Sequence, residues 1–177
     1  MIDGSETLST IPADDSGADG WETVLRAVSL IFVGVVVLAG LVGFFGVRAR
    51  TAQSSGNGLT VSVEHASVTR PGLATPFSVA VATDDGTALP EQITTRINSD
   101  YLEMFDENGL EPEPASSYQN GQWTWWTFDV PQGHSELEVS FDVRLEPAVQ
   151  WGREGSATVE IDGDEKVTVE FATRVMP

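Results

Sequence analysis

Residues 137–145 read LEVSFDVRL, with an apolar side chain at each odd position and a polar or charged one at each even position. Strict alternation of this kind predicts a β-strand that buries one face and exposes the other. The same period of two recurs, less perfectly, over residues 59–64, 77–82, 93–97, 123–130, 157–161 and 167–175. Together these segments predict about seven strands.

An apolar face and a polar face on each strand are typical of a β-sandwich with water on both outer sides. Turn sequences separate the strands, and Asp162-Gly163-Asp164-Glu165 suits a tight hairpin. Residues 59–177 are therefore predicted to form an all-β domain, an immunoglobulin-like or fibronectin-III-like β-sandwich of about seven strands. The sequence lacks the Cys…Trp…Cys mark of true immunoglobulin domains, and a small β-barrel is the alternative.

Residues 100–117, DYLEMFDENGLEPEPASS, break the alternating pattern. Tyr101, Leu102 and Phe105 have the spacing of a helical turn, whereas Pro112 and Pro114 cannot join a central strand. We therefore expect this segment to be a long crossover between the two sheets.

A second pattern precedes the β-rich part. Residues 27–47 form a stretch of 21 residues, none of which is charged. A helix of that length is roughly 31 Å long, which matches the hydrocarbon core of a bilayer. With Arg26 before it and Arg48 and Arg50 after it, this stretch predicts a transmembrane helix over residues 23–50. A buried core helix and a cleaved signal peptide are the alternatives. A signal peptide fits less well than a signal anchor, because the preceding segment is long and acidic.

The segments on either side of this span are polar. Residues 1–22 are expected to be a disordered acidic tail, and residues 51–58 (TAQSSGNG) a flexible tether. Inside the span, Ala39, Gly40 and Gly43 are small enough to let a second transmembrane helix approach closely. Small residues are also common in membrane spans, so helix-mediated association is one of two interpretations.

Two arguments about orientation disagree. One arginine precedes the span and two follow it, which places the C-terminal side in the cytoplasm by a margin of one residue. Small anchored β-domains more often lie outside the cell, and long domains cross the membrane largely regardless of such counts. We expect a single-pass protein of the cell membrane with an extracytoplasmic C-terminal domain.

The charge balance limits the classes of partner. The 177 residues include 27 acidic and 9 basic side chains, for a net charge of −18. Nucleic acid and anionic lipid head groups would repel such a chain, so neither is expected as a main partner. The absence of cysteine excludes a disulfide framework, a thiol nucleophile and a cysteine metal site.

Catalytic signals are weak. The sequence has only two histidines, His65 and His134, with no nucleophile motif, phosphate loop or histidine pair at metal spacing. We expect a non-enzymatic protein without a cofactor, and a hydrolase that depends on His134 is the alternative.

Two acidic turns are candidate calcium sites, because calcium prefers oxygen ligands. Asp106 and Asn108 are the better pair, and Asp162-Gly163-Asp164-Glu165 is the other. Solvated turns are the alternative in a chain this acidic. Arg70 and Arg153 lie in predicted turns of the same acidic chain, and we expect each to pair with a neighbouring carboxylate.

Tryptophans are concentrated near the fourth predicted strand. Alternation sends Trp126 to one face of that strand and both Trp123 and Trp125 to the other, while Trp151 follows the strongest strand. Both faces cannot be core, so Trp123, Trp125 and Trp151 are candidates for a surface that binds a partner protein or a glycan. In the alternative, Trp123 and Trp125 pack beneath residues 100–117.

Four stretches carry a resemblance: VTRPGLATPFSV (68–79), FDENGLEPEPA (105–115), WTFDVPQG (126–133) and LEPAVQWGREG (145–155). They resemble a group of uncharacterised small single-pass membrane proteins of high-GC Gram-positive bacteria. The resemblance covers residues 59–177 and implies an anchor followed by an outward-facing β-domain. It implies no catalytic or binding residues.

These observations favour a membrane-anchored accessory or interaction module of the cell envelope that binds a protein partner in the membrane or envelope. A cell-wall or glycan-binding module that uses its exposed tryptophans is the alternative.

Overall fold

The structure is a computed structural model that describes residues 18–41 and 46–176. The chain divides into two units, residues 1–45 and 46–177, and each is described by itself. The predicted tail before residue 18 lies outside the described residues.

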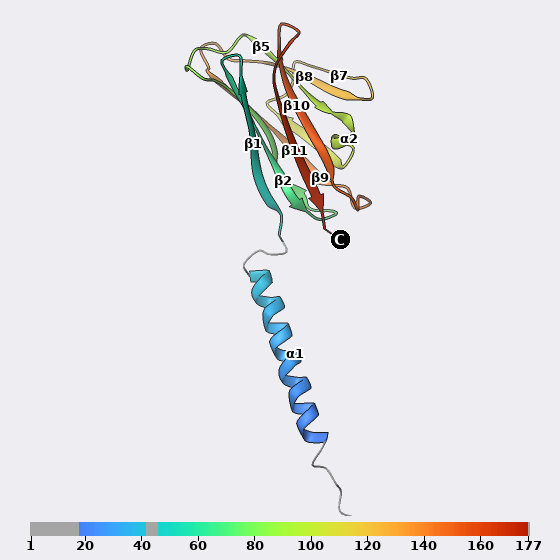
Figure 1. Cartoon of the computed structure of the whole chain (residues 1–177). Helices are drawn as coiled ribbons and strands as arrows, with labels where there is room; N and C mark the ends of the chain where they lie inside the picture. Colours follow the sequence, from blue (N-terminus) through green and yellow to red (C-terminus); the bar gives the residue numbers. More distant parts are fainter. Residues whose placement is uncertain (1–17, 42–45, 177) are drawn as a thin grey trace, which may run out of the picture. The chain divides into compact units, whose positions relative to one another are not determined.

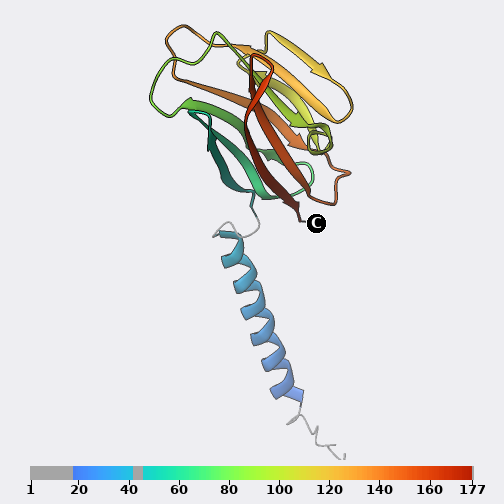
Figure 2. The same ribbon diagram turned by 45° about the horizontal axis from the view of Figure 1, so that its top comes forward.

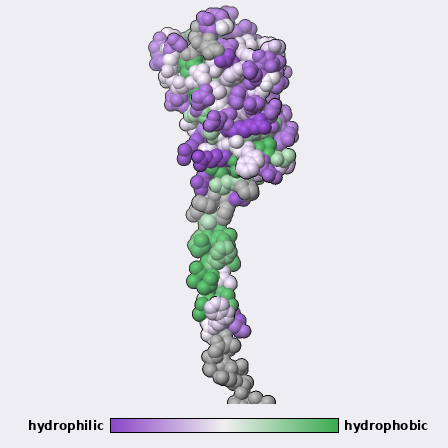
Figure 3. Space-filling model, turned by 45° about the vertical axis from the view of Figure 1, so that its right-hand side comes forward, coloured by the Kyte–Doolittle hydropathy of each residue, from purple (hydrophilic) through white to green (hydrophobic). Residues whose placement is uncertain are grey.

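The described residues of the first unit form one helix, α1 (Ala18–Leu41). Its segment Gly20–Leu41 has 22 residues and is long and apolar enough to cross a membrane. Apolar side chains cover it and are exposed (Figure 3). The helix begins before the predicted boundary at residue 23. Ala39 and Gly40 lie in its last turn, and Gly43 lies outside the described residues.

The second unit is an all-β domain, as predicted, but its described residues form eleven strands where about seven were expected. They are β1 (Arg48–Gly56), β2 (Leu59–Thr69), β3 (Ala74–Thr75), β4 (Phe77–Thr83), β5 (Gln92–Asn98), β6 (Phe105–Glu111), β7 (Ser116–Gln119), β8 (Trp123–Asp129), β9 (Glu136–Leu145), β10 (Arg153–Ile161) and β11 (Asp164–Val175). One short helix, α2 (Ser99–Leu102), follows β5.

The strands form one curled sheet in the order β3-β9-β4-β2-β11-β10-β5-β8-β7, with β1 also pairing with β2 and β6 with β9 (Figures 1 and 2). Neighbours are antiparallel except β2 and β11, which run parallel where Val68 pairs with Arg174. This contact divides the sheet into a first half (β1, β2, β3, β4, β6, β9) and a second half (β5, β7, β8, β10, β11). Trp126 of the second half contacts Phe141 of the first, with ring centroids 5.4 Å apart, so the inner faces of the two halves enclose a shared core.

The predicted strand faces are confirmed. Along β9 every odd residue from Leu137 to Leu145 is buried and every even residue is exposed. Trp126 and Phe128 of β8 point into the same core, as their alternation predicts. Hydrophobic burial of these inner faces is the main source of the domain's stability.

An aromatic cluster with a hydrogen-bonded hydroxyl chain lies where the two halves join. The Phe77 ring lies 5.5 Å from Tyr101 and 5.9 Å from Phe171. The fully buried Tyr101 hydroxyl lies 2.9 Å from Thr173 Oγ1, and the Thr173 hydroxyl donates to the Ala66 carbonyl at 2.7 Å. Burial raises the pKa of Tyr101 to about 12, against a smaller opposite effect of the Thr173 hydrogen bond. These two hydrogen bonds tie α2 to β11 and β11 to β2.

The prediction of a flexible tether over residues 51–58 was wrong, and so was the extension of the transmembrane helix to residue 50. Residues 48–56 form β1, which pairs with β2 along its whole length. Asn57 and Gly58 both have positive φ, 54° and 76°, as a two-residue type I′ turn requires. The turn reverses the chain, and Ala52 then packs against the core instead of remaining solvated.

The segment 100–117 does cross between the halves, but it is more regular than predicted. Its helical turn is confirmed as α2. The residues after it form β6, which pairs with β9 of the first half, and β7, which pairs with β8 of the second half. Pro112 and Pro114 lie between these two strands, as their lack of a ladder N–H requires.

We predict that Tyr101→Phe lowers the free energy of unfolding by about 1–2 kcal/mol, because Thr173 loses a buried hydrogen-bond donor while the packing remains. Denaturant unfolding of the full chain in mild detergent, followed by near-ultraviolet circular dichroism, measures the change. Tyr118→Phe is the matched control, since the Tyr118 side chain is exposed. Equal stability of the Tyr101→Phe variant and the natural protein would contradict a structural role for the hydroxyl chain.

Candidate functional site

The outer face of the second half carries aromatic and basic side chains in register. Tyr118 of β7 and Arg96 of β5 both pair with Trp125 of β8, one on each side. Trp123 lies two residues before Trp125 and therefore on the same face. We call Arg96, Tyr118, Trp123 and Trp125 the aromatic row.

Contacts within the aromatic row hold its side chains in place. The Tyr118 and Trp125 rings have centroids 5.4 Å apart at an angle of 38°, and the Arg96 guanidinium lies 4.5 Å from the centre of the Trp123 ring. A cation over an indole face is an attractive arrangement. Arg96 also forms an ion pair of 3.2 Å with Glu160 of β10. The two indoles are half-buried, whereas Tyr118 is 65% exposed.

The predicted separation of Trp126 from Trp123 and Trp125 is confirmed, since Trp126 is buried in the core. The alternative in which residues 100–117 cover the outer indoles is wrong. Residues 116–117 begin β7, which pairs edge to edge with β8 and extends the sheet sideways instead of passing over it. The outer indoles therefore stay half-buried on the outer face, where Tyr118 and Arg96 contact them.

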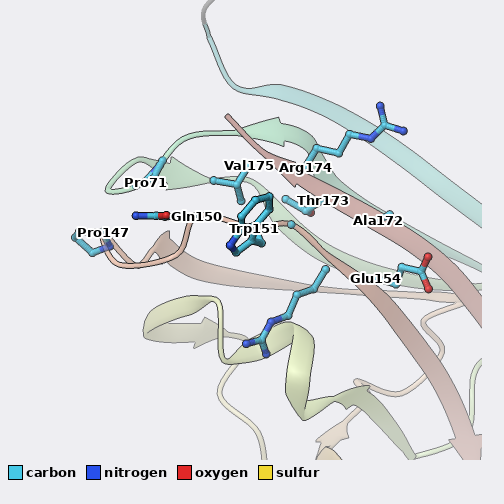
Figure 4. A pocket seen from close by; sticks show the side chains of 11 residues that line it. Pro71, Pro147, Gln150, Trp151, Glu154, Ala172, Thr173, Arg174 and Val175 are labelled. Atoms are coloured by element: carbon cyan, nitrogen blue, oxygen red, sulfur yellow. The ribbon is translucent and has the colours of Figure 1, made fainter. Parts of the chain in front are cut away.

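Trp151 belongs to a different surface. It lies between β9 and β10, is 81% exposed, and lines a hollow of about 780 Å³ beside Thr173 and Val175 (Figure 4). None of the aromatic row lines this hollow. The backbone of the next residue, Gly152, packs directly on β11, because a Cβ there would lie 1.9 Å from the Thr173 carbonyl oxygen. This close approach fixes the chain on one side of Trp151.

The prediction that Arg153 pairs with a carboxylate is confirmed. The Arg153 guanidinium lies 3.1 Å from Glu103 Oε2 and also donates to the Asp100 carbonyl. Arg174, on β11, lines the Trp151 hollow together with Arg153.

A second hollow of about 470 Å³ shares Arg174 with the first and is also lined by Arg50 and His65. Arg50 pairs in register with His65, whose buried ring lies 5.1 Å from the Phe171 ring. Burial lowers the pKa of His65, and the positive charge of Arg50 lowers it further, although backbone hydrogen bonds oppose both effects.

The turn on which the calcium prediction depended does not form. Asp106 and Asn108 lie within strand β6, and Asp106 pairs in register with Arg144 of β9, a cation that disfavours a bound metal ion. In the described part of the chain, no three His, Asp or Glu side chains are grouped so as to hold a metal. Asp162 and Gly163, by contrast, form the predicted hairpin turn, with positive φ at both residues.

The two histidines lie on different parts of the domain. His65 lies in β2, whereas His134 is exposed in the turn between β8 and β9. A role for His134 as a catalytic base stays a prediction.

A scan against protein-family models and a search of curated proteins each returned no match. The resemblance to bacterial single-pass proteins therefore stays a prediction, and the function is argued from the surfaces alone.

We predict that acid destabilises the domain through His65. Its pKa in the fold lies below 6.5, so the unfolded chain binds a proton more readily, and stability falls as the pH drops from about 6.5 toward the pKa in the fold. The pH dependence of stability should disappear in His65→Phe, because the substituted ring can still pack against Phe171 but cannot bind a proton. Denaturant unfolding across that pH range measures it, with His134→Gln as the matched histidine control. An unchanged pH slope in His65→Phe would refute the assignment.

Proposed function

We propose that this chain is a single-pass protein of the cell membrane whose extracytoplasmic β-domain is a non-enzymatic accessory module that binds a partner protein. The aromatic row is the binding surface, and α1 is an uncleaved signal anchor. The domain is an immunoglobulin-like or fibronectin-III-like sandwich, an interpretation supported by its two facing halves of antiparallel strands.

The aromatic row is the observation that carries this proposal. Tryptophan, tyrosine and arginine are the residue types that dominate binding energy at protein interfaces. Here they lie together on one outer face, where alternation otherwise places polar residues. Tyr118 lies on β7, which ends the sheet and has all four residues exposed. The free backbone edge of such a strand is available to pair with a partner.

A partner protein fits the aromatic row better than a glycan does. Sugars stack on open ring faces, but the Trp123 face is occupied by Arg96 and Trp125 contacts Tyr118. Trp151 is the observation that favours the glycan alternative, because its indole is far more exposed. Within the membrane, Ala39, Gly40 and Gly43 are the proposed contacts of α1 with a second helix.

We predict that the β-domain faces the outside of the cell. The chain has no cysteine, so Ala88→Cys in the β-domain and Ser16→Cys before α1 each create a unique thiol. On intact cells a membrane-impermeant maleimide should label only Ala88→Cys, whose position is exposed, and both variants should react after lysis. Labelling of Ser16→Cys alone on intact cells would make the protein a cytoplasmic adaptor.

We predict a protein contact at Tyr118. A photo-crosslinking phenylalanine analogue at Tyr118 should join the full chain to a partner protein in intact cells. The same analogue at Glu138, which is exposed on β9 of the first half, should not. When the chain that carries the analogue also carries Trp125→Ala, its affinity for the partner protein should fall on the order of 30-fold, as for a typical hot-spot residue.

Trp151→Ala is the matched tryptophan control and should leave crosslinking at Tyr118 unchanged, because it lies on the other surface. Near-ultraviolet circular dichroism checks that both variants are folded. Crosslinks to material that resists protease and is degraded by glycosidases would instead support the glycan alternative.

A further inference from the structure

The two ends of the β-domain differ in charge. At one end, Arg48 pairs in register with Val68, Val68 with Arg174, and Arg153 with Thr173. Six of the domain's seven arginines lie at or within a few residues of these strand ends: Arg48, Arg50, Arg70, Arg144, Arg153 and Arg174. We call this the basic end. The seventh arginine, Arg96, belongs to the aromatic row.

Carboxylates are also present at the basic end, and they nearly balance the arginines. They are Asp100, Glu103, Asp106, Glu107, Asp142, Glu146 and Glu154. Six arginines and seven carboxylates leave a net charge of −1. Residues 46–177 as a whole carry 21 acidic and 8 basic side chains, a net charge of −13, so most of the excess negative charge lies elsewhere in the domain.

Much of that charge is at the opposite end, where the strands turn. Its exposed carboxylates are Asp84, Asp85, Glu91, Asp129, Glu136, Asp162 and Asp164, and none of the domain's arginines lies there. We call this the acidic end. A strand of ten residues such as β9 separates the two ends by about 30 Å, whereas charges are screened over about 8–10 Å at physiological salt. An anionic membrane surface at the basic end is therefore screened from the carboxylates of the acidic end.

The basic end also carries exposed apolar side chains. Four large apolar or aromatic side chains are exposed in the described part of the β-domain, and three of them lie here: Trp151 (81%), Leu73 (41%) and Met176 (39%). Trp151 lines the larger hollow together with Arg153 and Arg174. Exposed indoles beside arginines are typical of protein surfaces at the head-group layer of a membrane.

We propose that the basic end rests on the lipid head groups of the membrane that α1 crosses. The arginines contact lipid phosphates, and Trp151, Leu73 and Met176 enter the interfacial layer. The inference rests on the proposed function, because it requires α1 to span the bilayer. Only six residues, 42–47, connect Leu41 of α1 to Arg48 of β1, so the connection is short.

The arrangement answers the objection that a chain of net charge −18 avoids anionic lipid. The seven exposed carboxylates of the acidic end lie beyond the screening length, those at the basic end are nearly balanced by arginines, and guanidinium groups bind phosphate oxygens strongly. Each arginine near an anionic membrane surface strengthens binding by about fivefold.

The test uses the full chain reconstituted in vesicles. Ala74→Cys reports on the basic end and Ala88→Cys on the acidic end. Both alanines are exposed, and the two substitutions are chemically identical. A fluorophore on each thiol is quenched by lipids that carry a quencher on the head group. In vesicles of phosphatidylcholine and phosphatidylglycerol, the Ala74→Cys label should be strongly quenched and the Ala88→Cys label should not.

Proximity through the short connection would also bring the Ala74→Cys label near the membrane, so the charge dependence decides. Arg174→Gln should lower the ratio of docked to undocked domain about fivefold, and so should vesicles of phosphatidylcholine alone or high salt. Lys166→Gln in the β10–β11 hairpin is the matched change of charge at the other end and should have no effect. Trp151→Ala should also reduce quenching at Ala74→Cys.

Val35→Cys in the middle of α1 separates this inference from the proposed function. If its label is not quenched by lipids with a quencher deep in the acyl chain, then α1 does not span the bilayer and the proposed anchor fails. If that label is deep but quenching at Ala74→Cys is independent of lipid charge, salt and Arg174, the docking inference alone is overturned. Equal quenching of the Ala74→Cys and Ala88→Cys labels overturns it as well.

Discussion

The parallel contact between the ends of β2 and β11 turns a single sheet into a domain with an interior. Without it, the apolar faces of the two halves would have no partner, because each strand buries only one side. Tyr101 secures the contact through Thr173 and the Ala66 carbonyl, while Phe77 and Phe171 fill the space beside them. The core, the aromatic row and the basic end all take their positions from this closure.

The sequence predicted what local periodicity can encode. Alternation alone identified the inner face of β9 and placed Trp126 opposite Trp125, because the side-chain period of a strand is two. It missed β1, although Asn57-Gly58 is a strong hairpin signal, because polar residues precede that turn. It also missed β6 and β7. Their residues are mostly exposed, so neither strand has the alternating apolar face that marks the longer strands.

The sequence could group candidate site residues only when they lie on the same strand. Trp123 and Trp125 were found because they share a strand, but Arg96 and Tyr118 reach them across the sheet, and register between distant segments is not written in local pattern. The arginines show the same limit. They are scattered along the sequence and come together only because strand ends meet, so a net charge of −18 described the average and concealed the basic end.

The two proposed surfaces constrain each other. Strands lead away from the basic end, so a domain resting on head groups by that end would hold its strands away from the bilayer. The outer face of the second half would then stand upright on the membrane, and its side chains would point along the membrane surface. A binding face in that direction meets other membrane proteins close to the bilayer sooner than it meets a distant wall polymer. Docking of the basic end and a membrane-protein partner for the aromatic row are therefore compatible without depending on one another, and the glycan alternative gains nothing from that orientation.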